Sequence, residues 1–105
     1  MDTILHYIQG YAQSQPDALA VCELRKSLTY AEYWSSIRKA ATALQSMGIS
    51  SGDHVMLRCT QNIDYLVVFS ALQYMKALVV PIEKTTSAER AVEIGGRVDA
   101  SCLIT

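Results

Sequence analysis

The stretch that decides the fold of this chain begins Leu28-Thr29-Tyr30-Ala31-Glu32 and ends Gly48-Ile49-Ser50-Ser51-Gly52-Asp53. Thr29 is suited to cap a helix, and Glu32, three residues later, can bond back to the Thr29 amide, which is the capping-box pattern. Gly48 is suited to the left-handed position that ends a helix, and an apolar residue follows it. The stretch therefore predicts one complete helix with defined ends.

Residues 30–48 form this predicted helix. Their apolar side chains recur at steps of three and four, which defines one face over about five turns. They are Tyr30, Tyr33, Trp34, Ile37, Ala40, Ala41, Leu44 and Met47. We expect this face, with Trp34, to point into the core.

Residues 1–29 are predicted to lead into the long helix. A first helix over 3–14 ends before Pro16, because proline cannot continue an ordinary helix. Its apolar residues fall on one side, namely Ile4, Leu5, Ile8, Tyr11 and Ala12. The apolar segment 18–24 favours a strand, and 24–27 turns the chain back into a hairpin-like pair.

After Asp53 the pattern becomes a repeating unit of strand and helix. The expected elements are a strand at 55–57, a helix over 63–75 capped by Asn62, a strand at 77–82, a helix opened by the capping box of Thr86 and Glu89, and a strand at 102–104. We expect the last helix to carry Ala88, Ala91, Val92 and Val98 inward. Strands separated by helices in this way indicate βαβ crossovers. The predicted fold class is α/β, with βαβ units over 54–105 on a small parallel sheet.

The predicted helix over 63–75 is apolar on nearly every side. Such a helix needs cover on more than one face. Two explanations stay open: part of its surface is meant for a missing portion of a parent protein, or it lies centrally under the first two helices.

Composition excludes several classes of function. The 105 residues are 50% apolar and 18% charged, and the formal net charge is −1. Because no basic run is present, nucleic acid is not an expected partner. The start lacks the basic region of a secretory signal, and no apolar run is long enough to span a membrane. We expect a cytoplasmic protein.

Three cysteines, Cys22, Cys59 and Cys102, are widely spaced in apolar, strand-like segments. This pattern favours buried, reduced thiols. A zinc site would need closely paired cysteines, and we therefore expect no metal site.

The same motifs carry a family resemblance over most of the chain. The matching residues are Leu28-Thr29-Tyr30-Ala31-Glu32, Gly48-Ile49, Gly52-Asp53-His54-Val55, Ala77-Leu78-Val79-Val80-Pro81 and Glu89-Arg90. In this order they resemble the N-terminal portion of the adenylate-forming (AMP-binding) superfamily. This superfamily includes acyl- and aryl-CoA synthetases, adenylation domains of nonribosomal peptide synthetases, and luciferases.

The resemblance implies a parent enzyme that activates a carboxylic acid with ATP and Mg²⁺ to an acyl-adenylate. The acyl group then passes to a thiol, either coenzyme A or a carrier-protein pantetheine. The phosphate-binding loop and the lysine of the C-terminal lid lie outside the matched region, so residues 1–105 are expected to be one N-terminal subdomain, a scaffold fragment that is inactive alone. Its partner is then the remainder of the parent polypeptide in cis. Alone, we expect it to form a homodimer, because its last strand would leave an unpaired edge.

Two residues depart from the family pattern. Lys76 stands where relatives usually have glycine, and Lys84 stands where a proline often follows the strand. We therefore expect a divergent member with a different turn from helix to strand.

Open parallel sheets bind ligands at the carboxyl ends of their strands, so residues 58–62 and 83–86 are the informative loops. Neither loop has the glycines that wrap a pyrophosphate. Asn62, Thr85 and Thr86 could contact a ligand, but capping roles explain them.

His6 and His54 have no nucleophile nearby in the sequence, and Asp53 is expected to belong to the turn after Gly52. We assign no catalytic, cofactor-binding or metal-binding residue.

Two other functions stay open. The chain could be a self-contained, non-catalytic α/β interaction module, which a natural stop codon after Thr105 would favour. A flavodoxin-like nucleotide-binding domain is less favoured, because the first turn of the repeating unit has no phosphate cradle.

Overall fold

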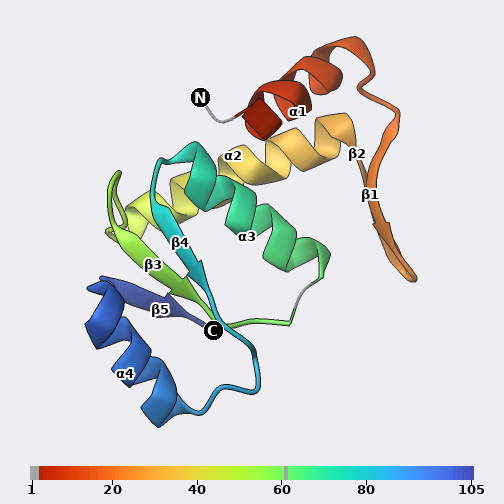
Figure 1. The fold of residues 1–105 in the computed structure, drawn as a ribbon. Coiled ribbons are helices and arrows are strands. Elements are labelled where there is room, and N and C mark those ends of the chain that lie inside the picture. The colour runs from red at the N-terminus through yellow and green to blue at the C-terminus, as the bar shows by residue number, and fades with distance from the viewer. Residues whose placement is uncertain (1–2, 61) are drawn as a thin grey trace.

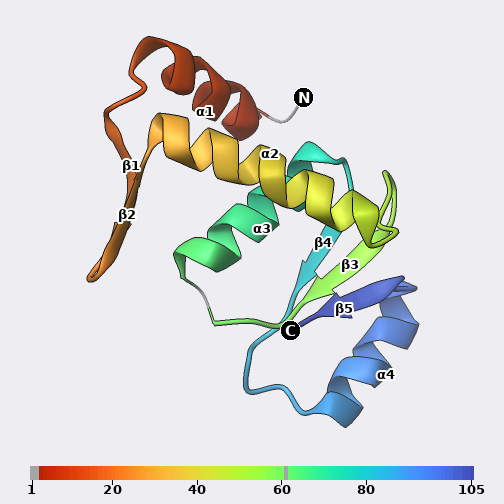
Figure 2. The same cartoon turned by 180° about the vertical axis from the view of Figure 1, so that it is seen from behind.

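The computed structural model describes residues 3–60 and 62–105. Its elements in chain order are α1 (Thr3–Ser14), β1 (Leu19–Glu23), β2 (Lys26–Thr29), α2 (Tyr30–Ser46), β3 (His54–Leu57), α3 (Ile63–Tyr74), β4 (Leu78–Pro81), α4 (Ala88–Val98) and β5 (Cys102–Ile104). Figure 1 shows α1 and the β1–β2 hairpin at one end of the molecule and α4 at the other. Figure 2 shows from behind how α2 links the two ends.

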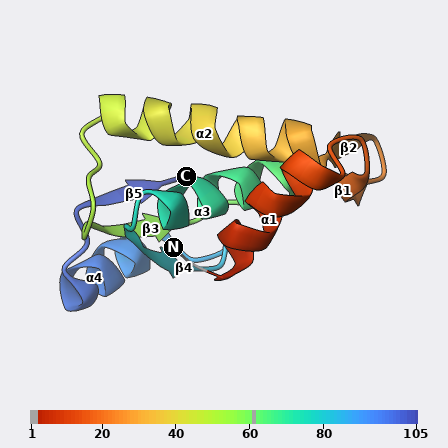
Figure 3. The same ribbon diagram turned by 90° about the horizontal axis from the view of Figure 1, so that it is seen from above.

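The strands form two sheets. β1 and β2 pair antiparallel, which confirms the predicted hairpin. The second sheet has the order β4-β3-β5, and both of its pairings are parallel. Figure 3 shows α2 and α4 on opposite sides of this sheet, and α3 contacts both α2 and β4. The predicted α/β class with a small parallel sheet is therefore confirmed.

The predicted signals at both ends of α2 are confirmed. The Thr29 hydroxyl accepts from the Glu32 amide at 3.2 Å, and the Thr29 amide donates to the Glu32 carboxylate at 2.9 Å. At the other end Gly48 has a φ of +98°, a value that glycine adopts without steric cost. The amide of Ile49 reaches back to the Leu44 carbonyl at 3.2 Å, one of the two bonds of a Schellman motif. The helix ends at Ser46.

Most of the predicted inward face of α2 is buried, and the core residues are Tyr33, Ile37, Ala41 and Leu44. Trp34 is only half-buried, and its ring meets the Tyr74 ring edge-on at 5.6 Å. The prediction that Met47 points inward was wrong, since this side chain is 69% exposed. Met47 is the C-cap, and the chain turns away there, so Ile49 takes its place in the core.

Only a narrow stripe of α1 is buried, although its predicted bounds are confirmed. Leu5 and Ile8 lie in the core, whereas Ile4 is 58% and Tyr11 40% exposed. The prediction that all the apolar residues of this helix face inward was therefore wrong. α1 packs chiefly on α2, so one stripe of side chains is covered.

α4 begins one residue later than its predicted capping box implies. Its N-cap is Ser87, whose hydroxyl accepts from the Arg90 amide at 3.1 Å, and the cap role of Thr86 was wrong. The Thr86 amide instead closes a turn on the Glu83 carbonyl.

The inward face of α4 also differs from the prediction. Ala91 is buried and Val98 half-buried, whereas Ala88 is exposed and Val92 is 75% exposed. The side that turns inward is therefore the one with Ala91 and Gly95, and Val92 points away from it.

The two glycines of α4 offer a matched pair of substitutions. A Cβ on Gly95 would lie 3.0 Å from the Met56 sulfur, whereas a Cβ on Gly96 meets nothing within 4 Å. Alanine is favoured over glycine inside a helix by about 1 kcal/mol. We expect Gly96→Ala to raise the free energy of unfolding by about that amount and Gly95→Ala to add nothing or lower it. Urea unfolding of both variants tests this, and equal stabilisation would contradict the close packing of α4 on β3.

The cysteines are less buried than predicted. Cys22 is exposed because β1 belongs to a two-stranded hairpin with little cover, while Cys59 and Cys102 are half-buried. All three are free thiols. Burial, with a smaller contribution from the charge of Asp53, raises the pKa of the Cys102 thiol.

Lys76 occupies a position that favours glycine. Its φ is +64°, in the left-handed region, and its carbonyl accepts from the Gly52 amide at 3.0 Å. Glycine adopts this backbone conformation without steric cost, whereas Lys76 adopts it with a side chain.

Candidate functional site

The two loops at the carboxyl ends of β3 and β4 meet in the structure. The Arg58 guanidinium donates to the Thr86 carbonyl at 2.9 Å, which joins one loop to the other. The Arg58 amide donates to the Ile104 carbonyl at 2.9 Å, so the same residue also ties β3 to the end of β5. Arg58 thus organises this edge of the sheet.

A cavity of about 330 Å³ opens at this edge. It is lined by Leu57, Arg58, Cys59, Thr60, Asn62, Asp64, Tyr65, Val68, Lys84, Ile104 and Thr105. Its basic side chains are Arg58 and Lys84, while the acidic Asp64 forms an ion pair with Lys26 at 2.8 Å. The cavity therefore offers positive charge and hydroxyl groups, which suit an anionic group.

Of the three polar residues predicted to have capping roles in these loops, the structure confirms that role only for Asn62. The Asn62 side chain accepts from the Tyr65 amide at 2.9 Å, so its predicted cap role is confirmed. Thr86 uses its carbonyl for Arg58, and Thr85 lies exposed in the same turn. The role of Arg58 was not predicted, although its charged side chain directly follows a buried strand.

Neither histidine lines this cavity. His6 is exposed on α1, with its ring 6.2 Å from that of Tyr7. His54 is half-buried, and its Nδ1 lies 2.6 Å from the Val98 carbonyl. Because a carbonyl only accepts, Nδ1 carries the proton, and this bond fastens α4 to the start of β3.

The Asp53 carboxylate accepts from the Ser50 amide at 2.9 Å, which confirms its predicted place in the turn.

The described residues do not fit the triphosphate of ATP or its Mg²⁺. Among residues 3–60 and 62–105, no three His, Cys, Asp or Glu side chains gather where they could hold a metal ion. The adjacent glycines, Gly95 and Gly96, lie inside α4 and form no phosphate loop.

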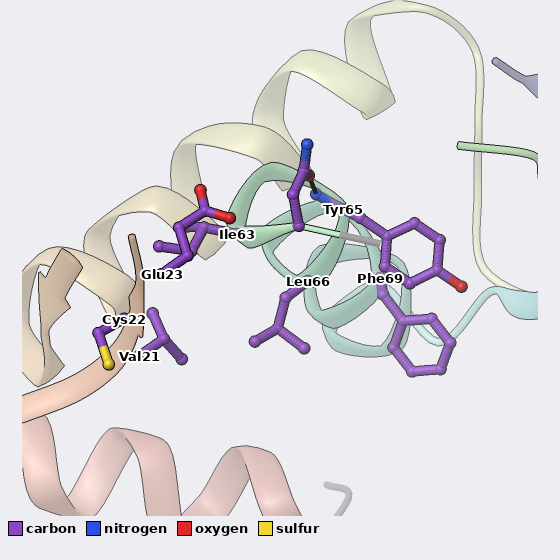
Figure 4. A pocket seen from close by; sticks show the side chains of 8 residues that line it. Val21, Cys22, Glu23, Ile63, Tyr65, Leu66 and Phe69 are labelled. Carbon is purple, nitrogen blue, oxygen red and sulfur yellow. Dashed lines mark hydrogen bonds between the residues drawn. The ribbon is translucent and has the colours of Figure 1, made fainter. Parts of the chain in front are cut away.

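A second hollow, of about 620 Å³, lies between β1 and the first half of α3. Figure 4 shows Leu66 and Phe69 projecting from α3, with Val21 of β1 across from them. Its lining is mainly apolar, which is typical of a packing surface more than of a reaction site.

The fold matches that of solved N-terminal domains and subdomains. The N-terminal subdomain of NpsA from Klebsiella oxytoca superposes with a TM-score of 0.89 at 21% identity, covering 100% of this chain and 28% of that one. The N-terminal domain of FACL13 from Mycobacterium tuberculosis gives 0.88 at 23% identity, covering 98% and 26%. The fold is therefore that of part of such an N-terminal domain.

The sequence defines the family. The profile of the family described as "AMP-binding enzyme" matches residues 8–105, and the chain belongs to this family. A D-alanine–D-alanyl carrier protein ligase from Bacillus licheniformis is 28% identical over 91 residues, or 87% of this chain. Malpibaldin synthetase from Mortierella alpina is 28% identical over 100 residues, or 95% of this chain.

The chain spans only a small part of these relatives. It covers 18% of the ligase and 2% of malpibaldin synthetase.

Among the helices of residues 3–60 and 62–105, none has both the length and the apolar character that a membrane span needs.

Proposed function

We propose that this chain is the N-terminal scaffold of an enzyme that joins a carboxylic acid to a thiol through an acyl-adenylate. The family match over residues 8–105 carries the proposal. A carboxylate oxygen attacks the α-phosphorus of ATP and pyrophosphate leaves, after which a thiolate attacks the acyl carbon and AMP leaves. Groups of the remaining polypeptide would hold the Mg²⁺ that the resemblance implies, and the ion would neutralise phosphate charge there.

The residues of this chain build the framework and perform no step of that chemistry. β3, β4 and β5 supply three adjacent parallel strands, and α2, α3 and α4 cover their faces. The groups that bind ATP and the acid then come from the remainder of the parent polypeptide, which is the expected partner in cis. The three free thiols are consistent with the cytoplasmic location that we propose.

The acceptor thiol separates two versions of this proposal. The first is an acyl-CoA synthetase that uses coenzyme A. The second is an adenylation domain that loads a carrier-protein pantetheine, and the carrier protein ligase among the relatives of this chain supports it.

Pyrophosphate exchange tests the reaction. We expect the whole gene product to exchange labelled pyrophosphate into ATP when a cognate acid is present, and the 105-residue chain alone to show no exchange above a heat-killed control. The physical reason is that residues 3–60 and 62–105 form no glycine-rich loop that would preorganise a phosphate site. Exchange by the chain alone would contradict the scaffold role.

Thioester formation separates the two acceptors. Coenzyme A and a phosphopantetheinylated carrier protein are offered in parallel to the active gene product, and mass spectrometry identifies which becomes acylated. A gene product that exchanges no pyrophosphate with any acid of a broad panel would favour the rival, an interaction module without catalysis.

A further inference from the structure

Two hollows that share a lining residue lie along α3. The hollow beside β1 and a second one of about 360 Å³ beside β4 share Phe69 in their linings. We call this surface the α3 groove, and its main residues are Val21, Leu66, Phe69, Gln73, Lys76 and Leu78.

The α3 groove has the composition of a protein interface. Leu66 is 37% and Leu78 58% exposed, although both are large and apolar. The twelve residues of α3 include one charged side chain, Asp64, and Lys26 neutralises it. Interface cores are likewise poor in charge and rich in aromatic residues.

The two ends of the groove carry opposite charges. Glu23 lines the end at β1, and Lys76 is the charged residue lining the end at β4. The Lys76 backbone is held on both sides, because its amide donates to Gln73 and its carbonyl accepts from Gly52. Phe69 lies midway along α3, between these ends.

We propose that the α3 groove binds the α3 groove of a second copy of this chain, with a two-fold axis near Phe69. A two-fold axis at this point reverses the groove, so Glu23 of one protomer faces Lys76 of the partner subunit, and the contact occurs twice. Phe69 then packs at the centre with the exposed leucines around it. Opposite charges at the two ends also oppose a parallel arrangement, which would bring like charges together. The proposal does not depend on the proposed enzymatic function.

Sedimentation velocity of the 105-residue chain, from low to high micromolar concentration, tests this dimer. We expect the mass to rise from the 11.6 kDa of one chain toward twice that value. Glu23→Lys and Lys76→Glu are each expected to weaken the dimer about tenfold, because each reversal creates two repulsive contacts. The double variant is expected to return close to the affinity of the unchanged chain.

Controls keep the experiment decisive. Lys39→Glu makes the same charge change as Lys76→Glu at an exposed position of α2 that does not line the groove, and should leave the dimer unchanged. Circular dichroism confirms that each variant is folded. Lys76→Glu keeps a non-glycine residue in the left-handed region, so backbone strain is matched.

Three outcomes would overturn the proposal. If the chain stays monomeric at high micromolar concentration, the groove does not bind a second copy and is instead available to other segments of the same polypeptide. A dimer that is insensitive to both reversals uses another surface, such as the edge of β5. If the single variants weaken the dimer and the double variant does not restore it, Glu23 and Lys76 do not face each other across the interface.

Discussion

Ile37→Ala is expected to lower the free energy of unfolding of this chain by about 2–5 kcal/mol. The Ile37 side chain is 0% exposed and lies in the middle of the buried stripe of α2. It belongs to the cluster that joins α2 to α3 and the sheet, together with Leu72 and Val55. Truncation removes apolar contacts and leaves a cavity that packed neighbours only partly fill.

Urea unfolding followed by circular dichroism measures this loss. Lys39→Ala provides the matched control, because it truncates an exposed side chain of the same helix. The control should change the free energy of unfolding by less than about 0.5 kcal/mol. A loss below about 1 kcal/mol for Ile37→Ala would mean that α2 packs much more loosely than its burial indicates.

The buried hydrogen bond between Tyr33 and Ser70 should show the second largest effect. The two hydroxyl oxygens lie 2.8 Å apart and join α2 to α3 inside the core. Tyr33→Phe leaves the Ser70 hydroxyl without this partner, and Ser70→Ala does the same to Tyr33. Each change is expected to cost about 1–3 kcal/mol, because a buried polar group then loses its hydrogen bond.

The double variant distinguishes this bond from simple packing. When both hydroxyls are removed, no polar group stays unsatisfied, so the total cost should fall clearly below the sum of the single costs. Additive costs would contradict a coupled pair.

The unfolding of the Tyr33 and Ser70 variants should be measured near neutral pH. Burial raises the pKa of Tyr33, against a smaller lowering by the Ser70 hydrogen bond. A raised folded-state pKa contributes stability that is fully present below the unfolded value of about 10 and is lost as the pH rises through the folded value. At neutral pH Tyr33 is therefore protonated in both states.

Local signals in the sequence were sufficient for the element order. The Thr29 capping box and Gly48 define α2 because their hydrogen bonds join residues within a few positions of each other. Asn62 caps α3 for the same reason. Alternation of such helices with short apolar strands predicted the parallel sheet, since parallel strands need a crossover between them.

The candidate site was only partly predictable. The loops at the carboxyl ends of β3 and β4 follow from the sheet topology. The bond from Arg58 to Thr86 does not, because it joins residues 28 positions apart and depends on how two loops meet. No local pattern encodes a contact of that kind.

By itself, the sequence determined the family, the order of the elements and most helix ends, all of which depend on neighbouring residues or on motif order. Only the tertiary structure decided where the predicted inward faces end and which apolar residues lie outside them. Met47, Cys22 and Val92 are apolar by type, but they lie where α2 has ended, where a hairpin lacks cover, and where α4 turns away from the sheet. Burial is a property of what packs against a residue, and that partner comes from distant parts of the chain.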